Sequence, residues 1–180
     1  MKKLVAIALF SMFLFTSCNS ESSLQKYYVE KSESQDFVVL DVAPSILNID
    51  NAKLTVEQSQ ALASFEKMNV LAFKLNQTNS VIFDEEKAKV AEILKGKEYQ
   101  ELMRFSNRDG SASVSYIGTD DKIEEFVLFA SSDENGFAVV RILGKDMTPN
   151  SVVDMMSIVQ SSNLQVDQLK PIQDMFNKNL

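Results

Sequence analysis

The spacing of apolar residues predicts alternating strands and helices in the first half of this chain. A run of β-branched and apolar residues at 37–42 predicts a strand, which Pro44 ends because proline cannot donate to a strand ladder. Thr55 and Gln58 have the spacing of a capping box, in which each side chain bonds to the backbone of the other residue. The helix that follows is predicted to turn one apolar face to the core, formed by Ala61, Leu62 and Phe65.

A second strand and a second helix are predicted to follow. Residues 69–75 are apolar enough, and alternate clearly enough, to indicate a strand. Asp84 predicts the start of a helix, because aspartate is a good N-cap and the acidic residues after it suit the positive end of the helix dipole. Gly96 is expected to end this helix. Its apolar stripe is formed by Val90, Ala91 and Leu94.

From residue 99 onward a period of two replaces the helical period and predicts four more strands. They are expected at 99–106, 112–117, 123–130 and 137–143. Short polar links join them, two of which contain Asp-Gly or Asn-Gly, so neighbouring strands should pair antiparallel. The second of these strands is predicted to have one buried and one wetter face, because Ala112, Val114 and Tyr116 alternate with Ser113 and Ser115.

Thr148 and Pro149 predict the start of a further helix, with the threonine as cap and the proline as first helical residue. Its core-facing stripe is formed by Val152, Met155, Met156 and Val159. A weaker apolar set predicts a final short helix, formed by Leu164, Leu169, Ile172 and Phe176 and interrupted near Pro171. These elements predict an α+β fold with a mostly antiparallel sheet, built from two N-terminal strands and a four-stranded meander and covered by helices on one face.

The first eighteen residues have the pattern of a bacterial lipoprotein signal. Lys2 and Lys3 precede an apolar run at 4–15, which is too short to span a bilayer, where about 20 residues are needed. Residues 14–18, Leu-Phe-Thr-Ser-Cys, look like a lipobox, in which Cys18 is acylated with fatty chains such as palmitate. We therefore expect a signal peptide at 1–17, a lipid-anchored polar tether at 18–26 and a single α+β domain at 27–180.

Several segments carry a resemblance to a known family. They are the lipobox, the strand that ends at 43–45, the segment 97–103 (Lys-Glu-Tyr-Gln-Glu-Leu-Met) and the segment 142–147 (Ile-Leu-Gly-Lys-Asp-Met). With them the chain resembles, over residues 30–178, a family of small Bacteroidota lipoproteins classified as a domain of unknown function. The resemblance implies a place in the cell envelope and supplies no catalytic or ligand residues. Genes of such proteins often lie beside those of extracytoplasmic-function sigma factors, which implies envelope signalling.

Composition narrows the chemistry that this chain can perform. The sequence has no histidine, and Cys18 is its only cysteine, so the commonest general base and the usual zinc ligands are missing once Cys18 is acylated. We expect no catalytic residue, no cofactor and no metal site. The net charge of −7 becomes more negative when Lys2 and Lys3 are removed, and it speaks against a nucleic-acid partner, which needs a basic stripe.

Two other classes of function stay open at this point. A carboxylate-based hydrolase acting on envelope polymers needs two acids about 5–9.5 Å apart, and many acids are present, although the sequence has no tryptophan for sugar subsites. The acidic pairs at 120–121 and 133–134 do not have the spacing of a calcium loop and are predicted to be turns. A carrier of an apolar ligand would need a cavity of about 300 Å³ or more, lined by Met155, Phe65 and Phe73.

The interpretation that these observations favour is a lipid-anchored envelope protein with a non-catalytic binding or sensing domain. We expect it in the outer membrane, facing the periplasm or the cell surface, and attached through Cys18. The expected partner is another envelope protein. The candidate surface is the open face and edge of the meander, around Arg104, Tyr116 and Arg141.

Overall fold

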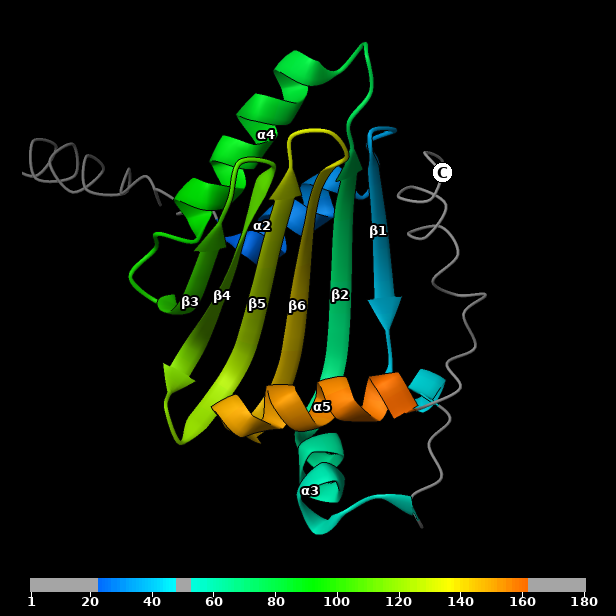
Figure 1. The fold of residues 1–180 in the computed structure, drawn as a ribbon, viewed down its shortest axis with the longest axis vertical. Helices are drawn as coiled ribbons and strands as arrows, with labels where there is room; N and C mark the ends of the chain where they lie inside the picture. The colour runs from blue at the N-terminus through cyan, green and yellow to red at the C-terminus, as the bar shows by residue number, and fades with distance from the viewer. Residues whose placement is uncertain (1–22, 48–52, 162–180) are drawn as a thin grey trace, which may run out of the picture.

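Six antiparallel strands form one sheet, and helices pack against it (Figure 1). The computed structural model describes residues 23–47 and 53–161. Within these residues the strand order is β1-β2-β6-β5-β4-β3. The strands are β1 (Phe37–Val42), β2 (Phe65–Lys74), β3 (Gln100–Ser106), β4 (Gly110–Thr119), β5 (Lys122–Ser132) and β6 (Gly136–Met147). The helices are α2 (Leu24–Lys31), α3 (Val56–Ser64), α4 (Ser80–Ile93) and α5 (Pro149–Ser161), with a 3₁₀ turn, η2 (Pro44–Leu47).

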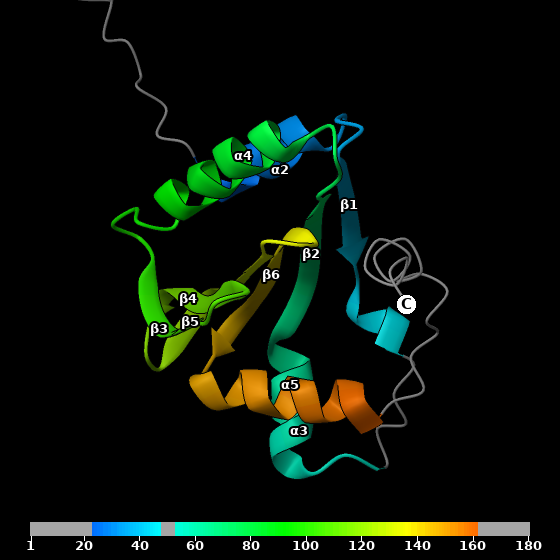
Figure 2. The same cartoon turned by 45° about the horizontal axis from the view of Figure 1, so that its top comes forward.

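Helices α2 and α4 lie together over one face of the sheet (Figure 2). Aromatic side chains fill the space between them and the strands. Phe73 on β2 stacks on Phe137 on β6, with 5.4 Å between the ring centroids, and both are fully buried. Phe83 of α4 and Leu24 and Tyr28 of α2 complete this layer. Burial of each large apolar side chain contributes about 1.5–3 kcal/mol, so this layer is the main core.

The opposite face of the sheet carries a smaller core at one end of the strands. There α5 crosses the strands and contacts α3 (Figure 1). Val152 of α5 packs against a buried cluster formed by Tyr116, Ile123, Phe126 and Met147. The strand segments beyond α5 have no helix over them in the described part of the chain (Figure 1).

The α+β class and the mostly antiparallel sheet predicted from the sequence are confirmed. The strand at 37–42 and the four meander strands are present, with ends shifted by a few residues. The predicted capping box is also present. The backbone N–H of Gln58 donates to the Thr55 hydroxyl at 3.2 Å, and the backbone N–H of Thr55 donates to the side-chain oxygen of Gln58 at 3.0 Å. The cap therefore begins α3 as the sequence predicts.

Three predicted boundaries are wrong. Phe65 does not lie on the helix face, because the backbone becomes extended at Phe65 and β2 starts there. Helix α4 starts at Ser80, before Asp84, because the Asn79 carbonyl already accepts a bond from the Phe83 amide at 2.9 Å. Helix α2 starts at Leu24, inside the segment predicted as tether, because Ser23 caps it and Leu24 is buried.

Some predictions fall outside the described residues. These are the signal peptide, Cys18 and the final helix with Leu164, Leu169, Ile172 and Phe176, together with the side chains of Met156 and Val159. In the part that is described, no helix is long and apolar enough to cross a membrane.

Candidate protein-binding surface

Strand β4 turns its serine side chains toward α2 and α4 and its apolar side chains toward the opposite face of the sheet. Ser113 and Ser115 are 7% and 4% exposed, whereas Ala112 is exposed. Ser113 lies opposite Phe129 in the register, and Phe129 belongs to the core beneath α2 and α4. Alternation alone distinguishes two faces of a strand without telling which of them the helices cover. An apolar patch that remains exposed on one face of a strand says more about a possible binding surface than a buried apolar residue does.

The neighbouring strands extend this open apolar position into a surface. In antiparallel pairs, residues directly opposite each other carry their side chains on the same face. The register joins one row across Ala130, Ala112 and Phe105, and a second row across Leu128, Val114 and Met103. We call these six residues of β3, β4 and β5 the apolar strand face. Phe105 and Met103 are 65% and 62% exposed, and the surface lies on the side of the sheet that α5 crosses.

Strand β3 ends the sheet and is exposed along its whole length. All seven of its residues, Gln100 to Ser106, are exposed. Its register against β4 shifts between Glu101 and Met103, which marks a β-bulge. Arg104 forms an ion pair with Glu101 on the face opposite the apolar strand face, where its Nε donates to the Glu101 carboxylate at 2.9 Å. This pair lowers the pKa of Glu101.

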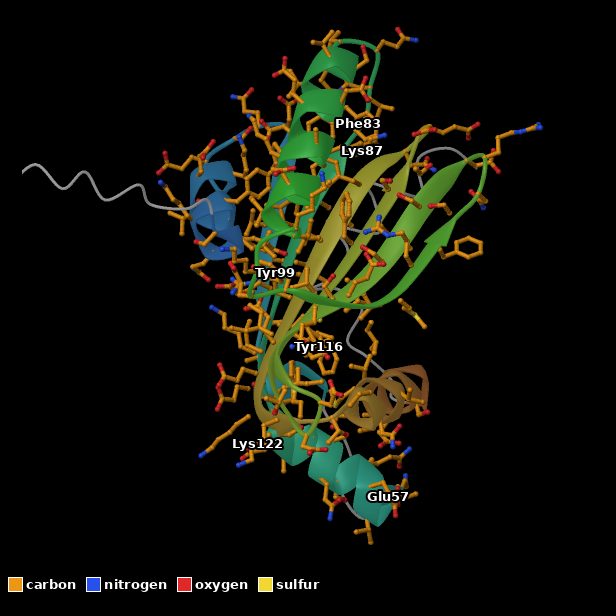
Figure 3. The ribbon with its side chains drawn as sticks, turned by 90° about the vertical axis from the view of Figure 1, so that its left-hand side faces the viewer. Glu57, Phe83, Lys87, Tyr99, Tyr116 and Lys122 are labelled. Carbon is orange, nitrogen blue, oxygen red and sulfur yellow. The ribbon has the colours of Figure 1, made fainter. Side chains whose placement is uncertain are left out.

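The three residues predicted as a shared partner surface lie in different places. Arg104 is exposed on β3, as expected of a surface residue. Tyr116 and Arg141 are only 7% and 6% exposed, so the prediction of an exposed surface around them is wrong. Arg104 and Arg141 project from the same face of the sheet, but α2 covers the second of them. Tyr116 projects from the other face, near α5 (Figure 3).

Both buried side chains have polar partners that explain their burial. Arg141 donates to both carboxylate oxygens of Glu125, at 2.8 and 2.7 Å, and to the Gln25 side chain of α2 at 2.5 Å. Tyr116 donates its hydroxyl to Asp120 at 2.5 Å. This bond raises the pKa of Tyr116. Cross-strand neighbours and a helix over the sheet cannot be read from a strand's own spacing, which is why the sequence did not reveal them.

A second buried polar group joins the two helices of the main core. Glu86 of α4 is 5% exposed and accepts bonds from Tyr27 of α2 at 2.7 Å, from Lys31 at 3.0 Å and from Lys89 at 2.7 Å. Burial raises the pKa of Glu86, and the three donors lower it by more, so that the net shift is downward. The pKa of Tyr27 is raised by burial and by this carboxylate. These groups connect α2 to α4.

Two cavities lie elsewhere on the described part of the molecule. One, of about 690 Å³, lies between the start of α2 and the end of α4 and is lined by lysines and glutamates as well as Tyr27 and Ile93. The other, of about 400 Å³, lies between α4 and the serine side of β3 and β4, next to Lys87. Neither is lined by Met155, Phe65 or Phe73, and Phe73 is fully buried in the main core. The cavity required by an apolar-ligand carrier is therefore not among these two.

The acidic side chains of the described residues form no candidate metal site. Among the described residues, no group of three or more histidine, cysteine, aspartate or glutamate side chains could hold a metal ion. Asp120 accepts the Tyr116 bond, and Asp133 pairs with Lys87 at 3.4 Å. The pKa of each of the carboxyl groups of Glu57, Glu86 and Glu101 is lowered. A general acid needs a shift in the other direction.

The geometry defines a small α+β domain with one sheet face covered by helices and the other partly open. A comparison with family models places it more narrowly. The chain belongs to the family described as a domain of unknown function, DUF4252, whose model matches residues 27–155. Neither a curated protein nor a solved structure matches the chain.

Proposed function

We propose that this protein is a lipid-anchored protein of the bacterial cell envelope whose domain binds another envelope protein through the apolar strand face, without transforming it. The anchor is the acylated Cys18, in the outer membrane and facing the periplasm or the cell surface. The relation to small Bacteroidota lipoproteins belongs to the same proposal. The observation that carries the binding role is the outward orientation of the apolar side of β3, β4 and β5.

The composition of this surface supports a protein partner. All six side chains are apolar, and the four that are exposed, Ala112, Ala130, Met103 and Phe105, lie next to one another in the register. The large exposed apolar residues of the helices are spread over four helices, namely Val29, Val56, Val81, Ile82 and Val153. A contiguous exposed apolar patch is typical of an interaction site, whereas single exposed residues need no explanation. Methionine and phenylalanine adapt well to a partner surface.

The position of the anchor is compatible with this use of the surface. Helix α2 begins at Leu24, a few residues after Cys18, and an extended chain reaches about 3.5 Å per residue, or about 20 Å in all. Helix α2 packs on the face opposite the apolar strand face. A domain held from the α2 side therefore turns its apolar strand face away from the membrane. The surface would then be open to a partner in the periplasm or outside the cell.

The test is photo-crosslinking in cells that express the full chain. A photoreactive amino acid replaces Phe105 in one variant and Val81 in the matched control, because Val81 is an apolar residue of α4 that is 71% exposed. We expect a recurrent adduct with another protein from position 105 and none from position 81. Cys18→Ala should abolish the adduct and release the protein from the membrane fraction. Equal adducts from both positions, or none from position 105, contradict the proposal.

A further inference from the structure

The outer edge of β3 has no strand beside it among the described residues. Strand β3 is last in the sheet order, and Figure 3 looks onto this edge from the left-hand side of Figure 1. All seven residues are exposed, and the sequence Gln-Glu-Leu-Met-Arg-Phe-Ser contains no proline and no lysine. The other edge strand, β1, is exposed only at Asp41. An exposed edge of this kind presents free backbone donors and acceptors and is a template for a further strand.

The β-bulge gives this edge an unusual distribution of charge. In a regular strand, residues three apart project from opposite faces. Here the extra residue between Glu101 and Met103 brings Glu101 opposite Ser115 and Arg104 opposite Ser113, which are two residues apart on β4. Glu101 and Arg104 therefore share one face, and their ion pair follows from it. Met103 and Phe105 project from the other face.

We propose that β3 pairs antiparallel with β3 of a second copy of this chain, so that Glu101 of each copy lies opposite Arg104 of the other. With the bulge in each copy, this alignment puts Gln100 opposite Phe105 and the two Met103 residues opposite each other. It places residues that project from the same face opposite each other, as antiparallel pairing requires. The two sheets then continue into one another.

Charge selects this register over its two neighbours, which satisfy the same condition. Sliding the copies until Gln100 lies opposite Met103 keeps the faces matched but places the two Glu101 side chains directly opposite each other. Sliding the copies until Met103 lies opposite Phe105 also keeps the faces matched, but it places the two Arg104 side chains directly opposite each other. Like charges opposite each other destabilise an antiparallel pair, and opposite charges stabilise it. In the proposed register, two glutamates and two arginines form two complementary cross-strand pairs. The edge is thus complementary to itself.

The symmetry of this pairing suits two anchored copies. The two-fold axis that relates two antiparallel edge strands of one sheet is perpendicular to the sheet, so each face of one copy continues into the same face of the other. Both α2 helices then lie on the same side, and both chains can leave toward one membrane. The two apolar strand faces lie side by side on the opposite side. The pairing goes beyond the proposed partner binding and does not depend on it.

Charge reversal in two separate chains tests the proposal. In Glu101→Arg every cross-strand pair of the homodimer becomes Arg-Arg, and in Arg104→Glu every pair becomes Glu-Glu. A mixture of the two variants restores both cross-strand pairs, although neither chain regains its internal ion pair. Sedimentation of the purified full chain in detergent over a concentration series should show a wild-type dimer. We expect each variant alone to dimerise at least about tenfold more weakly, and the mixture to recover wild-type affinity.

Several results would overturn this pairing. One is a monomeric wild-type chain, and another is a dimer that neither variant weakens, since that dimer would use another surface. A Glu101→Arg chain that dimerises as well as the wild type would point to the Arg104-Arg104 register. A mixture that stays monomeric would also contradict the proposal. Neither substitution alters the apolar strand face. The crosslink from position 105 and the dimer can therefore each be observed without the other, and the two proposals fail separately.

Discussion

At the scale of single residues, the buried ion pair of Arg141 and Glu125 explains how a charged side chain is tolerated beneath α2. The guanidinium carbon lies 5.6 Å from the ring centroid of Tyr28, and Gln25 accepts a further bond. The Glu125 bonds raise the pKa of Arg141 against the effect of burial, so the arginine keeps its charge. A buried ion pair of this kind adds little to the stability of the folded state. Removal of one partner, however, leaves the other charge buried and uncompensated, which destabilises the fold.

We therefore expect Glu125→Ala to reduce the free energy of unfolding by about 3–5 kcal/mol, measured by urea denaturation of the full chain. The matched control is Glu124→Ala, one residue away and exposed, which should change it by no more than about 0.5 kcal/mol. Equal effects of the two substitutions would show that the Arg141 charge is compensated in another way.

At the scale of elements, local signals in the sequence predict what lies within one element and fail where another element decides. The capping box of α3 was predictable because both of its bonds join residues three positions apart. The start of α4 was not, because Asn79 is held by Asp36 at 3.0 Å and by the Lys74 carbonyl at 3.1 Å, both distant from the helix pattern. The burial of Leu24, which places α2 on the sheet, depends likewise on strands that come later in the chain.

Loss of the α3 cap should have a measurable cost. Thr55→Ala removes the hydroxyl that accepts the Gln58 amide, and we expect the free energy of unfolding to fall by about 1 kcal/mol. Ser59→Ala is the control, because it removes an exposed hydroxyl from the helix interior, where alanine is the better helix former. A Thr55→Ala protein as stable as the Ser59→Ala protein in chemical denaturation would contradict the role of the cap.

At the scale of the whole molecule, the sequence was sufficient for the class of fold and insufficient for the surface. The change from helical spacing to a period of two predicts the meander, and the short links predict antiparallel pairing. The side of β4 that the helices cover is decided by Phe129, Phe137 and Phe73 on other strands, which bring α2 and α4 to the serine side. The predicted cluster of Arg104, Tyr116 and Arg141 therefore separates, and the apolar strand face takes its place as the candidate site.

The attachment of α2 to α4 through Glu86 predicts how the stability of the whole domain depends on pH. The folded pKa of Glu86 lies below its ordinary value of 4.5, so its contribution is present above that value and is lost as the pH falls through the folded pKa. Glu86→Gln should therefore be less stable than the wild type at pH 7, with the difference shrinking below about pH 5. Urea midpoints from pH 7 to pH 3 measure this, and a difference that stays constant over the range would contradict it.

The bulge in β3 means that the spacing of residues matters here as much as their identity. Glu101 and Arg104 share a face only because one residue too many separates them for a regular strand. An in-frame deletion of the codon for Leu102 would remove the bulge and leave Glu101 and Arg104 two residues apart, which is the spacing that keeps both on one face in a regular strand. A relative that lacks one residue here can therefore keep both charges on the same face, and relatives of this chain should be aligned at this edge by their pairing with β4 and not by residue count.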